Sequence, residues 1–262
     1  MPTWPRRPRF VAGNWKMHKL PAEGAALARE MVALRSADPA ARTCEVAVCP
    51  PFTALAAVGE ALKGSGVHLG AQNMHAETHG AFTGEVAGPM LAALGCRVVV
   101  LGHSERRHGM GETDEQVARK LRAALRDGLT PIVCVGELLA EREGGRTTEV
   151  LVRQVTAAYG GLDAATVRTT VVAYEPVWAI GTGKVASPEQ ARDAHRVIRA
   201  TLDQAIGAGV GGDVAILYGG SVNAGNAATL FAEDDIDGAL VGGAALEAAG
   251  FWKIVAAASA RP

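Results

Sequence analysis

The chain has 262 residues, of which 48% are hydrophobic and 20% are charged, and its 26 basic and 27 acidic residues leave a net charge of −1. This balance offers no general attraction for nucleic acid or a membrane surface, so an anion-binding site would have to be local. No apolar stretch approaches the roughly 20 residues that a membrane-spanning helix needs, and no apolar segment of a secretory signal follows the basic residues 1–9. The four cysteines lack CxxC spacing and lie in or beside apolar runs, which predicts buried, reduced thiols in a cytoplasmic protein.

Short apolar runs recur along the chain and alternate with longer segments rich in Ala, Leu, Glu and Arg. The runs lack strict polar alternation, as expected for parallel strands that are buried on both faces. The predicted strands are Phe10–Asn14, Glu45–Cys49, His68–Gly70, Val98–Leu101, Pro131–Val135, Thr170–Glu175, Ala215–Tyr218 and Gly238–Val241.

The intervening segments have helical periodicity. Helices are predicted over Ala22–Arg35, Asp114–Arg126 and Ser187–Ala205, the last beginning with Ser187 as N-cap and Pro188 at the first helical position. Eight strands alternating with helices fit a closed barrel or an open doubly wound sheet. No GxGxxG follows the first strand, which disfavours a dinucleotide-binding sheet. We therefore expect an α/β protein with a single (β/α)8 barrel over residues 10–262, preceded by an N-terminal extension, residues 1–9, of no assigned role.

A (β/α)8 barrel carries its chemistry at the carboxyl ends of its strands. Asn14 and Lys16 follow the first strand two residues apart, so an extended backbone would direct both side chains to the same side. His103 follows the fourth strand, just before a predicted helix that Ser104 could cap. A structural histidine is one interpretation. In the other, the helix N-terminus disfavours an imidazolium, so His103 would stay neutral and could act as an electrophile through an N–H.

Glu175 ends the sixth apolar run, an unusual place for a carboxylate. A salt-bridged structural role is one interpretation, and a general base with limited solvation is the other. The segment Pro176–Lys184 follows, with an apolar tip between a proline and the glycines Gly181 and Gly183. This composition is typical of a lid that excludes water.

Glycine pairs follow the last two strands, at Gly219-Gly220-Ser221 and at Gly242-Gly243. Glycine pairs alone mostly mark tight turns. After strands seven and eight of a barrel, however, such turns bind phosphate through backbone N–H groups.

Together these segments resemble the triosephosphate isomerase family over nearly the whole chain. The resemblance is carried by residues 13–17, 102–107, 173–183 and 218–222, which read GNWKM, GHSERR, AYEPVWAIGTG and YGGSV. It implies a single (β/α)8 TIM barrel that interconverts dihydroxyacetone phosphate and D-glyceraldehyde 3-phosphate, without a metal ion or an organic cofactor.

The resemblance also implies residue roles. Glu175 would move a proton between two carbon atoms, His103 would polarise the carbonyl, and Lys16 with Asn14 would stabilise the anionic substrate. Glu105 would support Lys16 and His103 from behind. The phosphate would accept hydrogen bonds from Gly181, Ser221, Gly242 and Gly243.

The family forms homodimers through the loop after strand three, and residues 72–74 and 80–85 look like that loop. Thr83 would then reach Asn14 of a second copy. His18 departs from the family's more common Asn, which affects the expected interface rather than the chemistry. The implied small-molecule partner is a phosphorylated triose, with no nucleic acid and no membrane.

Two alternatives remain at this stage. Another phosphate-binding barrel, such as an aldolase or a tryptophan-pathway isomerase, would share the glycine turns, but strand six offers no Schiff-base lysine before Glu175. A non-catalytic scaffold of the same fold would be expected to have lost Glu175, His103 or Lys16, and all three are present.

Overall fold

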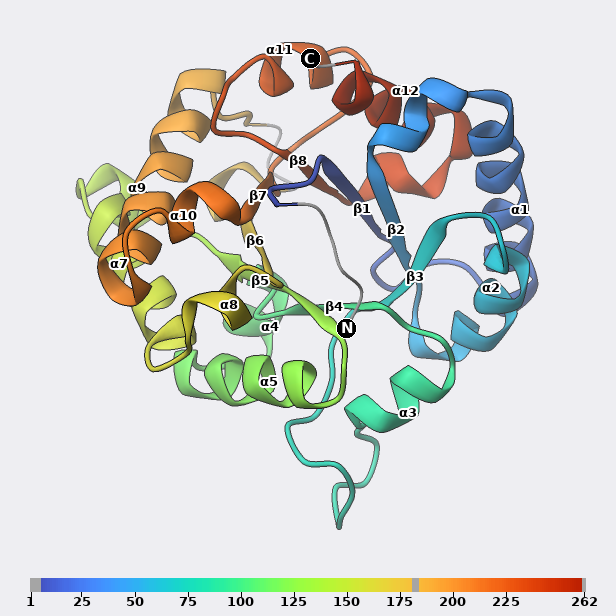
Figure 1. The fold of residues 1–262 in the computed structure, drawn as a ribbon, viewed down its shortest axis with the longest axis horizontal. Coiled ribbons are helices and arrows are strands. Elements are labelled where there is room, and N and C mark those ends of the chain that lie inside the picture. Colours follow the sequence, from blue (N-terminus) through green and yellow to red (C-terminus); the bar gives the residue numbers. More distant parts are fainter. Residues whose placement is uncertain (1–5, 181–183, 261–262) are drawn as a thin grey trace.

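Eight parallel strands form a closed barrel surrounded by helices (Figure 1). The computed structural model describes residues 6–180 and 184–260. The strands are β1 (Phe10–Asn14), β2 (Glu45–Cys49), β3 (Val67–Ala71), β4 (Val98–Leu101), β5 (Thr130–Val135), β6 (Val171–Tyr174), β7 (Ala215–Tyr218) and β8 (Gly238–Val241).

Each strand pairs with its neighbours in chain order, and β1 closes the barrel by pairing with both β2 and β8. Phe10 aligns with Glu45 on one side and with Gly238 on the other. Because every strand has two neighbours, no strand edge is left open.

Alternate strand residues face opposite sides of the barrel wall, and both sides are apolar. One set fills the barrel interior as a separate hydrophobic cluster, with Phe10, Ala12, Val98, Val100 and Leu217 among its members. The other set packs outward against the helices in a larger cluster. Burial on both faces explains why the strands show no polar alternation in the sequence.

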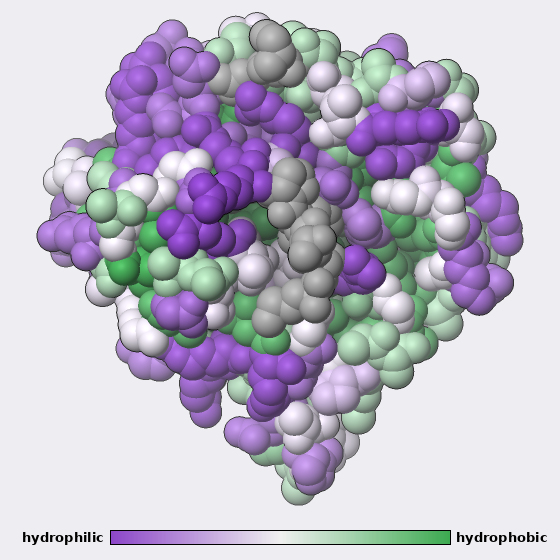
Figure 2. Space-filling view, in the orientation of Figure 1, coloured by the Kyte–Doolittle hydropathy of each residue, from purple (hydrophilic) through white to green (hydrophobic). Residues whose placement is uncertain are grey.

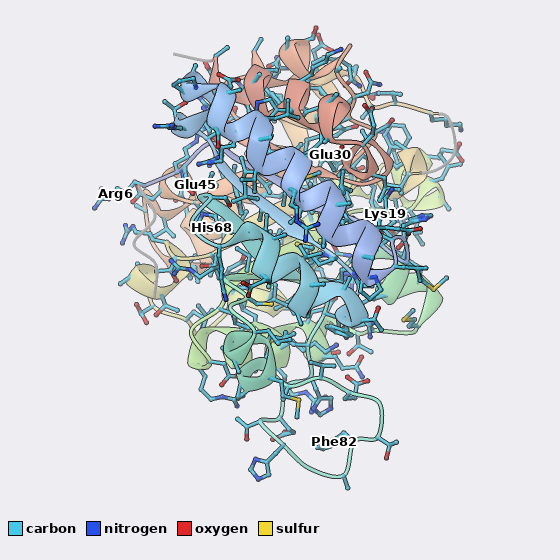
Figure 3. The ribbon with its side chains drawn as sticks, turned by 90° about the vertical axis from the view of Figure 1, so that its right-hand side faces the viewer. Arg6, Lys19, Glu30, Glu45, His68 and Phe82 are labelled. Atoms are coloured by element: carbon cyan, nitrogen blue, oxygen red, sulfur yellow. The ribbon has the colours of Figure 1, made fainter. Side chains whose placement is uncertain are left out.

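The helices cover the outside of this barrel, and α1 and α2 lie side by side in Figure 3. The α-helices are α1 (Pro21–Ala37), α2 (Leu55–Leu62), α3 (Gly88–Ala93), α4 (Ser104–Gly109), α5 (Asp114–Arg126), α6 (Leu139–Glu143), α7 (Thr147–Tyr159), α8 (Ala164–Val167), α9 (Pro188–Ile206), α10 (Val210–Asp213), α11 (Ala227–Phe231) and α12 (Ala248–Ser259). Short 3-10 helices are η1 (Pro39–Thr43), η2 (Phe52–Ala54), η3 (Val177–Ala179) and η4 (Gly243–Leu246).

The predicted (β/α)8 barrel is confirmed, and the element boundaries agree closely. Five predicted strands have the observed bounds, and β3, β5 and β6 differ by one residue at one or both ends. The Ser187 hydroxyl caps α9 by accepting a hydrogen bond from the N–H of Gln190, with Pro188 at the first helical position. All four cysteines are buried and free of disulfides, as the sequence predicts.

The loop between β3 and α3 projects away from the barrel, at the bottom of Figures 1 and 2. Phe82 lies in this projection, clear of the body of the molecule (Figure 3), and is 44% exposed. On the face seen in Figure 2, hydrophilic residues predominate at the upper left and apolar residues form smaller patches. No helix within the described ranges is long and apolar enough to cross a membrane.

His195 is a fully buried histidine on α9, outside the barrel wall. Its Nδ1 donates a hydrogen bond to the backbone oxygen of Asp235 at 3.0 Å, and burial lowers the pKa of the imidazole to about 3. The folded protein therefore holds this side chain in its neutral form at any pH well above 3.

This burial predicts a specific loss of stability in acid. The unfolded chain binds a proton at His195 below a pH of about 6.5, but the folded chain does so only near the lowered pKa, so stability falls as the pH drops from 6.5 toward 3. Between pH 7 and pH 5 this one group should reduce the free energy of unfolding by about 2 kcal/mol.

The measurement is urea unfolding of the parent and of His195→Phe at both pH values and at one protein concentration. The parent should lose about 2 kcal/mol more than the variant over that interval. Equal losses would show that His195 does not titrate differently in the folded and unfolded chains.

Candidate active site

A cavity of about 380 Å³ opens at the carboxyl ends of the barrel strands. The residues around it come from the turns after β1, β4, β6, β7 and β8, as expected for a barrel of this kind. The lining residues include Asn14, Lys16, His103, Glu175, Ala179, Ile180, Gly219, Gly220, Ser221, Leu240, Gly242, Gly243 and Ala244.

Lys16 enters the cavity from a strained turn. Its φ is +49°, in the left-handed region that non-glycine residues seldom adopt. The Asn14 side chain accepts a hydrogen bond from the Lys16 N–H at 3.0 Å, and the Gln72 amide donates to the Lys16 carbonyl oxygen at 2.7 Å. The same Gln72 amide donates to the carbonyl oxygen of Cys49 at 2.9 Å, which ties this turn to the end of β2. These contacts thus hold Lys16 in a backbone conformation that is unfavourable for a non-glycine residue.

Glu175 lies just beyond β6 and is only 2% exposed. One carboxylate oxygen accepts a hydrogen bond from the Ser104 N–H at 2.8 Å, and the other lies 2.9 Å from His103 Nε2. Burial raises the pKa of Glu175, but His103, the Ser104 N–H and Lys16 together outweigh burial and lower it. The carboxylate is therefore ionised in this geometry, as a base must be.

His103 occupies the N-cap position of α4, and Ser104 is the first residue of that helix. The prediction that Ser104 caps the helix is therefore wrong. The cap is formed by His103 Nδ1, which accepts a hydrogen bond from the Glu105 N–H at 3.3 Å. Because Nδ1 accepts, the hydrogen of a neutral ring must lie on Nε2, which faces Glu175.

The charge state of His103 depends on what faces Nε2. Burial lowers the pKa of His103, but the charge and hydrogen bond of Glu175 and the charge of Glu105 together outweigh burial and raise it. This net upward shift differs from the expectation based on the helix N-terminus, which did not include a carboxylate at 2.9 Å. The neutral form is favoured once Glu175 turns away or loses its charge.

Glu105 contacts both Lys16 and His103 but does not line the cavity. Its carboxylate pairs with Lys16 Nζ at 2.6 Å and lies 3.6 Å from His103 Nδ1. It is half exposed, so it orients Lys16 more than it adds to stability.

The glycine turns follow β7 and β8. They form the side of the cavity opposite His103, which follows β4. A Cβ atom at Gly219 would lie 2.9 Å from Glu175 Cγ, so glycine is needed where the two turns approach. A Cβ atom at Gly242 would lie 3.5 Å from Lys16 Cε, which places the turn after β8 beside the lysine. Gly243 begins the short helix η4, and the carbonyl of Gly242 accepts a hydrogen bond from the Ala245 N–H at 2.8 Å.

The first residues of the segment after Glu175 are anchored by a second buried carboxylate, Glu137, which is 0% exposed. Glu137 accepts hydrogen bonds from the Tyr174 hydroxyl at 3.1 Å and from Trp178 Nε1 at 2.9 Å, and Arg142 pairs with it at 3.2 Å. The Arg142 guanidinium also lies 4.7 Å from the centre of the Trp178 ring.

Sequence reasoning overlooked Glu137 and the supporting role of Gln72. Gln72 follows β3 directly, and Glu137 lies two residues after β5. The expectation that polar residues at strand ends belong to the site, which drew attention to Glu175, therefore applies to both. Apart from Arg142, which is five residues from Glu137, their partners are distant in the chain, so local sequence carries little sign of their roles.

The structure thus brings Asn14, Lys16, His103, Glu175, Ser221, Gly242 and Gly243 around one cavity, with Glu105 behind it. Gly181, the remaining predicted phosphate ligand, lies outside the described residues, as does Gly183. Thr83 is exposed on the projecting loop after β3. Among the side chains that the structure describes, no group of three or more His, Cys, Asp or Glu residues is arranged to hold a metal ion.

Comparison with known proteins agrees with this geometry. The model of the family described as triosephosphate isomerase matches residues 9–258. A triosephosphate isomerase of Bordetella pertussis is 55% identical over 257 residues, covering 98% of this chain and 100% of that protein. Those of Solibacter usitatus and Moorella thermoacetica are 52% and 53% identical over 250 residues, covering 95% of this chain and 99% and 98% of theirs. Because the family model matches residues 9–258 and relatives of this identity align over nearly their full length, the chain belongs to the triosephosphate isomerase family.

Proposed function

We propose that Glu175, His103 and Lys16 carry the reaction of the family in this chain, the interconversion of dihydroxyacetone phosphate and D-glyceraldehyde 3-phosphate. The reaction moves one proton between adjacent carbon atoms through an enediolate. The observation that supports these roles most directly is the buried contact between Glu175 and His103 at the edge of a cavity that also contains Lys16.

Glu175 must leave its resting partners before it can reach a carbon atom. In the resting geometry both of its oxygens are occupied, by the Ser104 N–H and by His103. When the carboxylate turns into the cavity, it loses the contacts that lower its pKa while remaining shielded from water. Its pKa then rises, which makes it a stronger base.

His103 would donate the Nε2 hydrogen to the substrate oxygen on which negative charge develops. Once Glu175 has accepted the carbon-bound proton it is neutral, and it no longer raises the pKa of His103. The imidazole is then a neutral donor, held in that tautomer by the Glu105 N–H on Nδ1.

Lys16 would stabilise both the phosphate and the enediolate, because its charge lies between the turn after β8 and Glu105. The N–H groups of Ser221, Gly242, Gly243 and Gly181 would hold the phosphate. Residues 176–184 would close over it as a lid and exclude water from the enediolate, which otherwise expels phosphate and yields methylglyoxal.

We assign the catalytic domain to residues 10–262 and the N-terminal extension to residues 1–9.

The protein would act as a cytoplasmic homodimer in which the loop after β3 docks on a second copy, with Thr83 near Asn14 of that copy. The exposed apolar side chains Met17 and Phe82, 93% and 44% exposed, support such an interface. A non-catalytic scaffold would have no need for a buried, oriented Glu175–His103 pair.

The Glu175→Asp variant tests the proposed base. Shortening the side chain by one methylene withdraws the carboxylate by about 1 Å, and a misplacement of that size lowers turnover roughly 100-fold. The measurement is kcat in a coupled assay with glyceraldehyde 3-phosphate, alongside the melting temperature. Glu60→Asp, an exposed change on α2, is the matched control and should retain parental kcat. Near-parental turnover in a folded Glu175→Asp enzyme would exclude Glu175 as the base.

Replacement of Lys16 by methionine tests the electrostatic role. The loss of a charge facing the enediolate should cost several kcal/mol at the transition state, a decrease in kcat/KM of at least about 1000-fold, with little change in melting temperature. Lys63→Met, which removes an exposed lysine paired with Glu60, is the control. A Lys16→Met enzyme that melts earlier but retains kcat/KM would show that Lys16 is structural.

The Thr83→Arg variant tests the proposed interface. A buried, unpaired charge at a contact between copies should dissociate the dimer and lower the activity of the folded monomer. Sedimentation velocity and kcat/KM are measured together, with Thr148→Arg on α7 as an exposed control. A fully active monomer would contradict the requirement for a second copy.

A further inference from the structure

A continuous set of contacts, buried at its centre, runs from the loop before β8 to the first residues of the proposed lid. It begins at Asp235, passes through His195 on α9 and Tyr174 at the end of β6, and ends at Glu137 and Trp178. His195, Tyr174 and Glu137 are each 0% exposed. None of the contacts between Asp235 and Tyr174 is used by the proposed mechanism.

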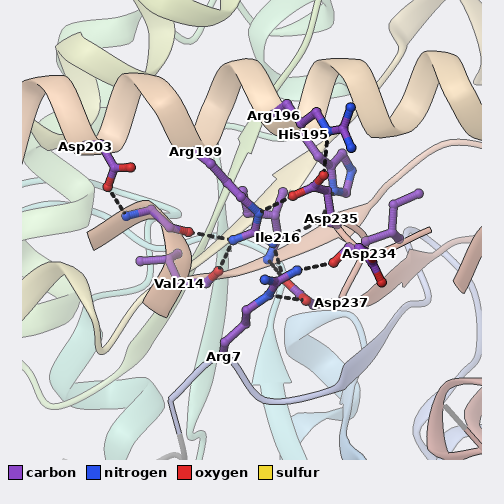
Figure 4. Close-up of polar contacts among 12 residues, drawn as sticks. Arg7, His195, Arg196, Arg199, Asp203, Val214, Ile216, Asp234, Asp235 and Asp237 are labelled. Atoms are coloured by element: carbon purple, nitrogen blue, oxygen red, sulfur yellow. Dashed lines mark hydrogen bonds and ion pairs between the residues drawn. The ribbon is translucent and has the colours of Figure 1, made fainter. Parts of the chain in front are cut away.

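The Asp235 end of this set is held by arginines (Figure 4). Arg199 donates to the Asp235 carbonyl oxygen at 2.9 Å and pairs with its carboxylate at 3.2 Å, and Arg196 donates to the same carboxylate at 2.7 Å. Arg199 also donates to Asp237 at 2.6 Å, and Arg7 donates to the other oxygen of that carboxylate at 2.7 Å. The carbonyl group that accepts from His195 therefore belongs to a rigid loop.

The His195 ring performs two tasks at once. Its Nδ1–H donates to the Asp235 carbonyl at 3.0 Å, and its ring lies perpendicular to the Tyr174 ring, at 85° with centroids 5.8 Å apart. Its Nε2 is buried with no hydrogen-bond partner, which carries an energetic cost. A phenylalanine would pack against Tyr174, and an asparagine would donate to the Asp235 carbonyl, each without a buried, unpaired Nε2. Histidine is therefore accounted for only because it makes both contacts.

Tyr174 connects His195 to the first residues of the proposed lid. Its hydroxyl donates to Glu137 at 3.1 Å, and Glu137 accepts from Trp178 Nε1 at 2.9 Å. The Glu137 backbone oxygen also accepts from the Val177 N–H at 3.1 Å. A tilt of the Tyr174 ring would therefore move the carboxylate that accepts from Trp178.

We propose that His195 is a positioning residue for the lid, acting through the ring of Tyr174 on the Glu137–Trp178 anchor. This inference rests on the proposed lid function of residues 176–184. The lid is anchored at its first residues by a set of contacts whose far end is fixed by the arginine-bound Asp235 loop.

Two substitutions separate the tasks of His195. His195→Asn retains a donor for the Asp235 carbonyl but removes the ring beside Tyr174, whereas His195→Phe retains a ring but removes one of the two donors to that carbonyl and leaves only Arg199. The readout is the fraction of substrate lost as methylglyoxal per isomerisation, measured with kcat and KM at a temperature well below the lowest Tm of the set. This fraction reports on lid closure and does not change when folded protein is merely lost.

We expect His195→Asn to raise the methylglyoxal fraction several-fold and to lower kcat. His195→Phe should melt earlier than the parent yet restore the fraction toward the parental value. Gln204→Ala, an exposed change on the same helix at a residue outside this set of contacts, is the matched control and should leave the fraction unchanged.

Tyr174→Phe completes a double-mutant cycle, because it removes the hydroxyl that contacts Glu137. If His195 acts through Tyr174, the effects of His195→Asn and Tyr174→Phe on the fraction should not add. Additive effects, or a parental fraction in both His195 variants despite a lowered Tm, would show that His195 serves only the packing of the core.

Trp178→Phe distinguishes a failure of this inference from a failure of the lid. It removes the Nε1–H that Glu137 accepts and acts on the lid directly. A raised fraction in Trp178→Phe with a parental fraction in His195→Asn would leave the lid in place and contradict the role of His195. A parental fraction in Trp178→Phe would overturn the lid proposal and this inference with it.

Discussion

The burial of one charged carboxylate is the constraint on which the rest of the site depends. Glu175 is 2% exposed, and a carboxylate removed from water in this way must be paired or hydrogen-bonded. Its partners, His103 and the Ser104 N–H, come from the far side of β5, so they meet it only when β4, β5 and β6 are in register. Arg107 secures that arrangement by donating to the carbonyl oxygens of Gly102 and Cys134. Closure of the barrel thus sets the geometry of the reacting groups.

Burial alone does not identify a base, because Glu137 is buried even more completely than Glu175. The difference lies in the partners. Glu137 is bound by three side chains, Tyr174, Trp178 and Arg142, and it does not line the cavity. Glu175 lines the cavity and is bound by one backbone N–H and by an imidazole that is itself reactive. The first carboxylate is a fixed anchor, whereas the second can exchange its partners for a substrate.

The sequence predicted the strands well because burial on both faces leaves a local signal, a short apolar run ended by a turn. It also placed Asn14, Lys16, His103 and Glu175 at strand ends, where the barrel brings them together. It did not predict the His103 cap, the left-handed Lys16 or the support from Gln72. The His103 cap is a local contact, but it is made by a residue type that is not among the preferred helix caps. The Lys16 conformation and the support from Gln72 depend on contacts between segments far apart in the chain or on a backbone angle that the surrounding structure imposes. The raised pKa of His103 has the same origin, since it comes from a carboxylate on another strand.

The resting pair also shows how stability and catalysis oppose each other here. Contact between Glu175 and His103 lowers the pKa of the carboxylate and raises that of the imidazole. The proposed proton abstraction needs the reverse, a more basic carboxylate and a neutral imidazole, so in that mechanism the contact that stabilises the folded site would have to break in each cycle. The free energy for breaking it has to come from substrate binding away from the reacting carbon atoms. In the proposed mechanism the phosphate, held by Lys16 and the glycine turns, would be the part of the substrate suited to supply it. The proposed lid would then keep water from taking the place of the broken contact.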